Sequence, residues 1–401
     1  MKIGIYLQGL GESFTHESLE KYARRFTRQY DFTNVNQGAE YDIRIDKFEF
    51  DKYHNLIANR VSVIEKNGGS ENVIYKFYEY SYVNELTSGF KSKNALLKTW
   101  LLFTGAFAKL PLMLKKLFFL NSNVGYTPRF RAQTFYLFFL FFLVSLAILF
   151  LLPAVVAMIV NTIAQSEYLK KMNLDIKVLN NTALAITNII ALLILFIPGL
   201  NDAIISMACE FVSASNYLNR GSSKQIIHGQ LDILIEQIIK EEGIDTKIYF
   251  HSYSFGSLIT LDYLFPYGIE PTIRMKQHIK GLITIGCPFD FVEVYFSKFF
   301  RDRDLSMGNL IQWINVYSTA DALGSNFRKT DDVGPAEYSF EDAAPKPVNI
   351  HYNVANVNMN SICQFITFYA LRAHGSYWHS DDSGQSGLRP LILEMRKLGF
   401  I

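Results

Sequence analysis

The stretch TKIYFHSYSFGSLITLDYL, residues 246–264, joins a strand-like run to a helix-like run through a turn of small residues. Residues 246–251 are rich in β-branched and aromatic side chains, which favour a strand. Residues 257–264 have the character of a helix. A strand followed closely by a helix is the repeating unit of α/β proteins, so this junction predicts an α/β fold.

The turn itself, SYSFG (residues 252–256), has the pattern of a strained strand-to-helix turn that exposes a nucleophile. Such a turn needs small residues two positions before and two positions after the nucleophile, because larger side chains do not fit. Ser254 meets this requirement with Ser252 and Gly256. Ser252 in the same role would put Phe250 at the first small position. We therefore predict Ser254 as the nucleophile, with a plain serine-rich turn as the alternative.

Further strands and helices are expected on both sides of this junction. KIGIYL (residues 2–7) predicts a strand that leads through a glycine turn into an amphipathic helix over residues 17–30. A helix over residues 222–241 is predicted by apolar residues at helical spacing: Ile226, Ile227, Leu231, Leu234, Ile235 and Ile238. Other β-rich runs occupy residues 73–83, 279–285, 311–317 and 348–354. Strands that alternate with helices predict a mainly parallel sheet with helices on both faces.

Two residues that follow predicted strands can complete the chemistry of Ser254, because sites in parallel sheets gather at the carboxyl ends of strands. A serine nucleophile needs a base, and the base needs an acid to orient it. We predict Asp321 as the acid and His374 as the base, with Asp290 and His379 as the second choices. The alternatives are a helix cap or Asx turn at Asp321 and an ordinary loop histidine at His374.

Acyl transfer also needs two N–H donors for the oxyanion of the tetrahedral intermediate. The first is the amide of Phe255, directly after the predicted nucleophile. The second is expected from QGLG (residues 8–11), with the Leu10 amide as the best candidate. The order strand, GxG, helix also occurs in dinucleotide-binding units, but Phe14 occupies the third glycine position, so nucleotide binding is the weaker alternative.

The composition narrows the class of protein. Of 401 residues, 49% are hydrophobic and 19% charged, with 33 Phe and 23 Tyr. This excludes a disordered, collagen-like or disulfide-stapled chain and indicates membrane contact. The net charge of +2 gives no reason to expect nucleic-acid binding. Cys209, Cys287 and Cys363 are widely spaced, which suits a reducing compartment. No HExxH, P-loop, EF-hand or clustered His/Cys motif occurs, so we expect no metal or cofactor.

Two apolar segments predict a transmembrane hairpin. Residues 135–160 are almost unbroken in their apolar character, and residues 179–200 carry no charge. A spanning helix needs about 20 apolar residues. The short loop between the segments places both flanks on one side, and the distribution of Lys and Arg favours the cytoplasm. A pair of buried core helices is the alternative.

The segment before the hairpin, residues 96–120, is interrupted by lysines and predicts a helix that lies in the membrane interface, or alternatively a core helix. The expected organisation is therefore a membrane insert at residues 96–202 between two parts of one α/β domain, residues 1–95 and 203–401. The N-terminal apolar run is too short for a signal peptide.

The chain resembles the α/β-hydrolase superfamily, in particular its lipase- and esterase-like serine hydrolases with a transmembrane insert. The resemblance is carried by KIGIYLQGLGES (2–13), VIYKFYEYSYV (73–83), HSYSFGS (251–257), LITIGCPFDF (282–291), NVYSTADALGS (315–325) and AHGSYW (373–378). It implies Ser254 as nucleophile, Asp321 as acid and His374 as base, in the chain order usual for the superfamily.

These observations predict a membrane-anchored serine hydrolase that cleaves an ester. A thioester or an amide is the less favoured substrate. The lipid bilayer is the expected partner and a lipid or acyl ester the expected substrate. The main alternative is a membrane scaffold or binding protein on an inactive hydrolase fold, since fold does not imply activity. A channel or transporter is a third possibility, for which two spans are few.

Overall fold

The computed structural model describes residues 1–10, 19–34, 39–93, 200–330, 332–341, 344–352, 373–378 and 386–401, with the single positions 97, 98, 101, 104, 105, 108 and 111. The chain divides into two compact units. One comprises Met1–Leu86, Asn123–Tyr136 and Tyr217–Ile401, and the other comprises Thr87–Ser122 and Leu137–Asn216. The sheet and the predicted triad belong to the first unit.

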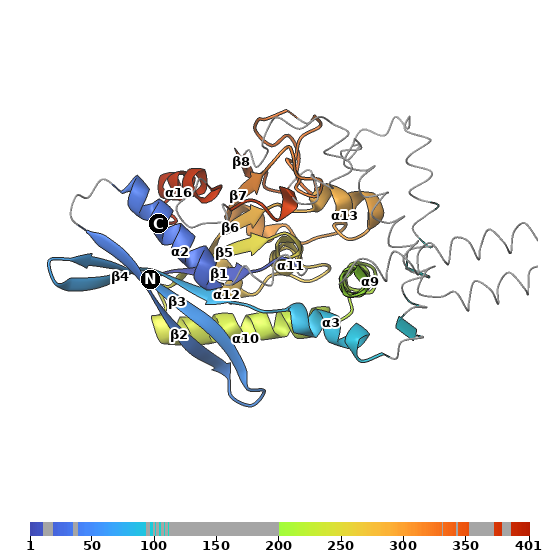
Figure 1. Ribbon diagram of the computed structural model, residues 1–401, viewed down its shortest axis with the longest axis horizontal. Coiled ribbons are helices and arrows are strands. Elements are labelled where there is room, and N and C mark those ends of the chain that lie inside the picture. Colours follow the sequence, from blue (N-terminus) through green and yellow to red (C-terminus); the bar gives the residue numbers. More distant parts are fainter. Residues whose placement is uncertain are drawn as a thin grey trace, which may run out of the picture. The chain divides into compact units, whose positions relative to one another are not determined.

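An eight-stranded sheet forms the centre of the first unit (Figure 1). Its strands are β1 (Lys2–Leu7), β2 (Glu40–Asp51), β3 (Leu56–Asn67), β4 (Ser70–Glu79), β5 (Lys247–Tyr253), β6 (Ile279–Ile285), β7 (Gln312–Tyr317) and β8 (Val348–His351). They lie in the order β2-β3-β4-β1-β5-β6-β7-β8. In this order, β4, β1, β5, β6, β7 and β8 run parallel to one another. In contrast, β3 is antiparallel to both of its neighbours, β2 and β4.

The central strands and the β2–β3 hairpin differ in burial. Every residue of β5 after Lys247 is buried, as is nearly all of β1 and β6. In contrast, most of β2 is exposed or half-buried. This contrast is typical of sheets in which helices cover both faces of the parallel strands and an antiparallel edge meets water. The carboxyl end of β5, which Ser254 follows, is therefore buried between the neighbouring strands β1 and β6.

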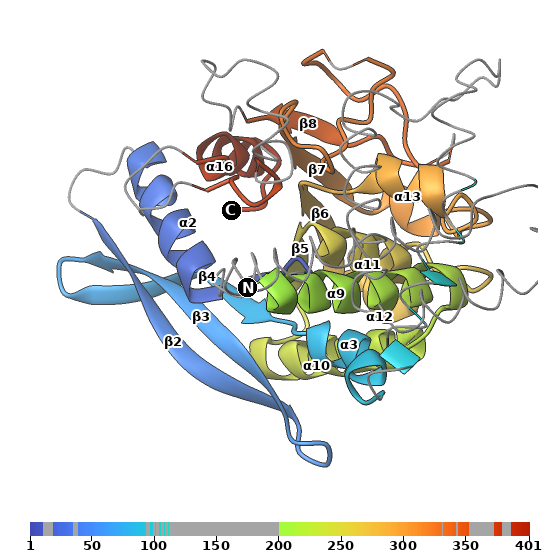
Figure 2. The same ribbon diagram turned by 45° about the vertical axis from the view of Figure 1, so that its right-hand side comes forward.

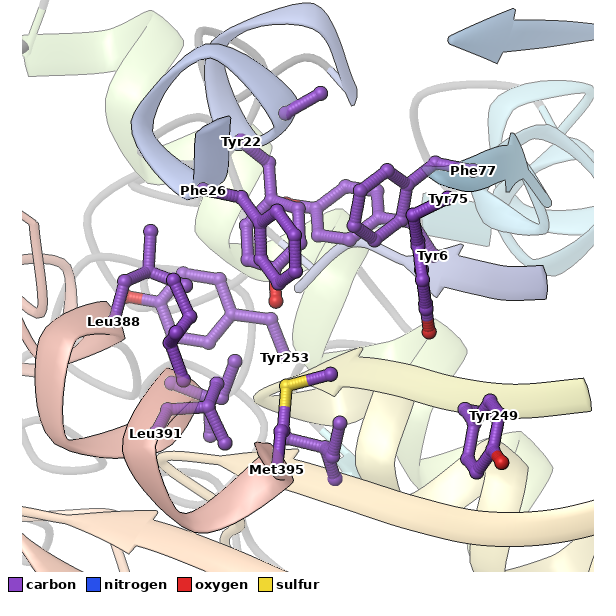
Figure 3. Packing of buried hydrophobic residues seen from close by; sticks show 14 of the residues in the cluster. Tyr6, Tyr22, Phe26, Tyr75, Phe77, Tyr249, Tyr253, Leu388, Leu391 and Met395 are labelled. Atoms are coloured by element: carbon purple, nitrogen blue, oxygen red, sulfur yellow. The ribbon is translucent and has the colours of Figure 1, made fainter. Parts of the chain in front are cut away.

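Helices cover both faces of this sheet (Figure 2). The described helices of the first unit are α2 (Leu19–Thr33), α10 (Lys224–Glu242), α11 (Phe255–Leu264), α12 (Ile273–His278), α13 (Phe289–Tyr295) and α16 (Leu388–Lys397). The helices α3 (Val83–Lys91) and α9 (Leu200–Arg220) are divided between the two units. α2 and α16 pack against each other on one face, and α10 and α11 lie on the other. The core beneath α2 and α16 is strongly aromatic: Figure 3 shows Tyr22 and Phe26 of α2 beside Tyr75 and Phe77 of β4.

Most of the expected elements are present with shifted ends. The strand at Ile279–Ile285 has its expected bounds, and α11 begins at Phe255, directly after Ser254. Two details of the prediction are wrong. The strand expected over residues 73–83 is β4, which ends at Glu79, and Val83 begins α3. Ile226 is 53% exposed, so it does not belong to the buried face of α10.

The hairpin β2–β3 adds an antiparallel part that the sequence analysis did not anticipate, so the sheet is only mostly parallel. In β2, EYDIRIDKFEFD, apolar and polar residues alternate over residues 41–45 and again over 48–50, but the phase shifts by one residue between the two runs. This shift and the many charged residues hide the pattern of a half-buried strand.

The predicted transmembrane hairpin, residues 135–160 and 179–200, and most of the predicted interfacial helix at 96–120 lie outside the described residues. Within the described part of the chain, no helix is both long enough and apolar enough to cross a bilayer. Cys209 and Cys287 are buried and free, and Cys363 lies outside the described residues.

Candidate active site

Ser254 occupies a sharp turn between the end of β5 and the start of α11. Its backbone has φ 50° and ψ −121°, a conformation that costs a residue with a Cβ about 1–3 kcal/mol. The Ser254 N–H donates to the Ile285 carbonyl of β6 at 2.8 Å. The neighbouring strand thus holds the strained turn in place. Local sequence explains why the turn can form, since Gly256 has no room for a Cβ.

His374 and Asp321 reach this turn from two distant segments. The Oγ of Ser254 lies 2.6 Å from Nε2 of His374. The other ring nitrogen of His374, Nδ1, lies 3.0 and 2.9 Å from the two carboxylate oxygens of Asp321. An ionised carboxylate only accepts hydrogen bonds, so Nδ1 carries the proton and Nε2 accepts from the serine hydroxyl. The relay runs from Ser254 to His374 to Asp321.

The triad is almost completely shielded from water: Ser254 and His374 are each 5% exposed and Asp321 is 0% exposed. Burial alone would raise the pKa of Asp321. However, the His374 imidazole, the Tyr377 hydroxyl and the Leu323 N–H outweigh burial and lower the pKa below its ordinary value. The Leu323 N–H donates to Oδ1 at 2.8 Å, so the Asx turn considered as an alternative also forms. Asp321 is thus kept ionised and oriented.

The two predicted oxyanion donors lie in segments that meet at the turn. The Phe255 amide is the first N–H of α11, so no carbonyl inside the helix accepts from it. A Cβ at Gly256 would lie 2.7 Å from the Gln8 carbonyl oxygen, which shows how closely the loop after β1 approaches α11. The Tyr82 hydroxyl donates to that same carbonyl at 2.8 Å. Leu10 belongs to this loop, and the role of its amide stays a prediction.

The second-choice residues have other contacts or lie outside the described part of the chain. The Ser252 hydroxyl is 2.7 Å from Thr260 Oγ1 and is completely buried, so it holds α11 to β5. Asp290 lies in α13 and accepts a hydrogen bond from Tyr338 at 2.8 Å. His379 lies outside the described residues, as do Gly11 and Phe14 of the dinucleotide alternative.

Several neighbours of the triad were missed by the sequence analysis. Tyr377 donates to Asp321 at 2.7 Å, and Tyr253 donates to the His374 carbonyl at 2.7 Å. Gly286, with φ 59°, ends β6 beside the His374 ring, where a Cβ would lie 3.2 Å from its Cε1. The glycine at the end of β6 was a visible signal, since LITIG places it after a predicted strand. Nothing in the sequence pattern marks the two tyrosines.

Within the described residues, no group of three His, Cys, Asp or Glu side chains is arranged to hold a metal ion. A hydroxyl beside an oriented imidazole can act as a nucleophile, and N–H groups at a helix start can stabilise negative charge on oxygen.

Comparison of the chain with family models, curated proteins and solved structures returned no match.

Proposed function

We propose that this protein is a serine hydrolase that cleaves an ester through Ser254, His374 and Asp321. One observation carries the proposal: the Ser254 hydroxyl, at a strained strand-to-helix turn, lies 2.6 Å from an imidazole whose far nitrogen is 2.9 Å from a buried carboxylate. A nucleophile, a base and an orienting acid in hydrogen-bond contact are the combination that acyl transfer requires. The α/β fold and the position of Ser254 after a central parallel strand support membership of the α/β-hydrolase superfamily.

In the proposed reaction, His374 takes the hydroxyl proton as Ser254 Oγ attacks the ester carbonyl. The resulting imidazolium is stabilised by Asp321, and the oxyanion accepts hydrogen bonds from the amides of Phe255 and Leu10. His374 then gives its proton to the departing alcohol, which leaves an acyl-enzyme on Ser254. Water, deprotonated by His374, attacks the acyl-enzyme and releases the acid.

The proposed substrate is a lipid or acyl ester, and the proposed setting is a membrane with the hydrolase domain on its cytoplasmic side. The apolar segments at residues 135–160 and 179–200 support this part of the proposal, because their lengths match a bilayer. An enzyme held at a bilayer meets acyl lipids at high local concentration. Turnover of short, water-soluble esters combined with no turnover of any long-chain ester by the protein in detergent would contradict this part.

The activity is tested by labelling carbonate-washed membranes with a fluorophosphonate probe, which reacts only with an activated serine. We expect labelling of the full-length wild type, loss of labelling in Ser254→Ala, and retention in Ser252→Ala. Ser252 is the matched control because its hydroxyl is two residues away and is engaged with Thr260. A folded wild type without labelling would instead support the inactive scaffold or binding protein.

A further inference from the structure

Tyr377 lies behind the acid of the proposed triad and is completely buried. Its hydroxyl accepts a hydrogen bond from the Ser318 N–H at 3.1 Å and donates to Asp321 Oδ2 at 2.7 Å. The same Oδ2 lies 2.9 Å from His374 Nδ1. One carboxylate oxygen is therefore shared between the predicted base and a tyrosine. Because the phenol oxygen accepts from the Ser318 N–H, the hydroxyl proton of Tyr377 points toward Asp321.

Two glycines make this approach possible. A Cβ at Gly324 would collide with Asp321 Oδ2 and lie 2.7 Å from the Tyr377 hydroxyl oxygen. A Cβ at Gly286 would lie 3.0 Å from the Tyr377 ring. Since any other residue at either position would crowd the tyrosine, the loop after β7 and the end of β6 leave the space that Tyr377 fills.

We propose that Tyr377 is a positioning residue, which fixes the Asp321 carboxylate in the orientation that holds His374 and limits the basicity of that carboxylate. This inference rests on the proposed function. A donor on Oδ2 withdraws electron density from the oxygen that faces His374 Nδ1. Without that donor, the negative charge on Asp321 is less well compensated, so the coupled triad gives up its proton at a higher pH.

The electrostatic surroundings agree with this role. Burial, and next the charge of Asp321, raise the pKa of Tyr377 well above its usual value, so the phenol keeps its proton and donates. Tyr253 of β5 also faces Tyr377, with the two ring centroids 5.9 Å apart. Its hydroxyl donates to the His374 backbone carbonyl at 2.7 Å.

The test is the rate at which a fluorophosphonate labels Ser254 in the full-length protein, measured from pH 5 to pH 9. For Tyr377→Phe we expect labelling that is about tenfold slower, as for loss of a hydrogen bond to a charged group. We also expect the pH of half-maximal labelling to rise by about half a unit to one unit. The matched control is Tyr263→Phe, which removes another tyrosine-to-aspartate hydrogen bond, to Asp232, away from the triad. It should leave the midpoint of the pH profile unchanged.

The outcomes separate this inference from the proposed function. The role of Tyr377 is overturned if the wild type is labelled and Tyr377→Phe shows the same pH profile as the wild type. It is also overturned if Tyr263→Phe shows an equal shift. Both outcomes leave the hydrolase proposal standing. Absence of wild-type labelling overturns both. If Tyr377→Phe does not fold, 3,5-difluorotyrosine at position 377 replaces it. This stronger donor should move the midpoint to lower pH, and an unmoved midpoint overturns the inference.

Discussion

Ser254 combines a reactive position with an unfavourable backbone. Its backbone, at φ 50° and ψ −121°, is strained for a residue that carries a Cβ. The turn persists because hydrogen bonds on both sides hold it. The Ser254 N–H donates to Ile285, and the Ser254 carbonyl accepts from Ser257. Stability and reactivity are therefore in conflict at this residue: the conformation that presents Oγ to His374 is one that glycine adopts more easily.

Replacing Ser254 with glycine should therefore stabilise the protein while abolishing its activity. We expect Ser254→Gly to raise the free energy of unfolding by about 1 kcal/mol, because the released strain exceeds the entropy that glycine adds to the unfolded chain. The measurement is the midpoint of urea unfolding in detergent. Ser254→Ala is the control, since it removes the same hydroxyl and keeps the Cβ. Equal midpoints for the two variants would show that the turn is not strained.

The sequence pattern predicts the role of Ser254 but gives no indication of a role for Tyr377. The small residues around Ser254 are sequence neighbours, so their spacing predicted the turn. Tyr377 meets Asp321 across 56 positions of the chain, and an isolated tyrosine in a loop carries no pattern. Contacts of this kind depend on how strands are placed in the sheet, which local spacing does not encode.

At the scale of elements, the critical contact joins α11 to the loop after β1. α11 can start directly at the turn because Gly256 lies against backbone: a Cβ there would be 2.7 Å from the Gln8 carbonyl oxygen and 2.8 Å from that of Leu7. Backbone atoms in a buried strand end cannot move aside as a flexible side chain can. The helix that presents Ser254 and the loop that carries Leu10 are thus positioned by the absence of one methyl group.

Gly256→Ala should accordingly destabilise the protein by about 1–3 kcal/mol and slow the labelling of Ser254. Gly229→Ala is the matched control, because this glycine lies inside α10 and a methyl group added to it would meet no neighbouring atom within 4 Å. It should stabilise the protein by about 0.5–1 kcal/mol through helix propensity. Urea unfolding and probe labelling of both variants decide the point. A Gly256→Ala protein as stable as the wild type would contradict the close approach.

Across the first unit as a whole, two histidines resist protonation: His251, which is completely buried, and His228, which is half-buried beside Asp262. His251 lies within hydrogen-bond distance of Tyr22 and Tyr75, and burial lowers its pKa to about 3. Burial is also the largest effect on His228, which lowers its pKa to about 4. Both resist protonation when folded, whereas in the unfolded chain they take up protons near pH 6.5. Folding is therefore coupled to proton release.

The sign of the resulting pH dependence follows from linkage. Below about pH 6.5 the unfolded chain binds protons that the native protein does not, so stability falls as the pH is lowered toward 4. Each histidine contributes up to about 1.4 kcal/mol per pH unit. Urea midpoints measured at pH 7, 6 and 5 should show this loss of stability. In His228→Gln the free energy of unfolding should depend less steeply on pH, by the equivalent of up to one bound proton. An unchanged slope in His228→Gln would show that His228 titrates normally in the native state.

The sequence alone determined the class of fold and the identity of the turn. Apolar runs of strand length, helical spacing in residues 222–241 and small residues around Ser254 are local properties, and local properties set local structure. The sequence did not determine the antiparallel β2–β3 edge, because the alternation in β2 shifts by one residue and is interrupted by charges.

Only the tertiary structure decided which residues meet. Ser254 and His374 are 120 positions apart, and His374 and Asp321 are 53 apart. Ser254 and Asp321 approach each other because β5, β6 and β7 are adjacent and parallel, so their carboxyl ends lie at one edge of the sheet. His374 reaches that edge from the separate segment 373–378. Burial at that edge also decided which groups stay neutral and which stay charged, since a pKa depends on the solvent and partners that the fold leaves to each side chain.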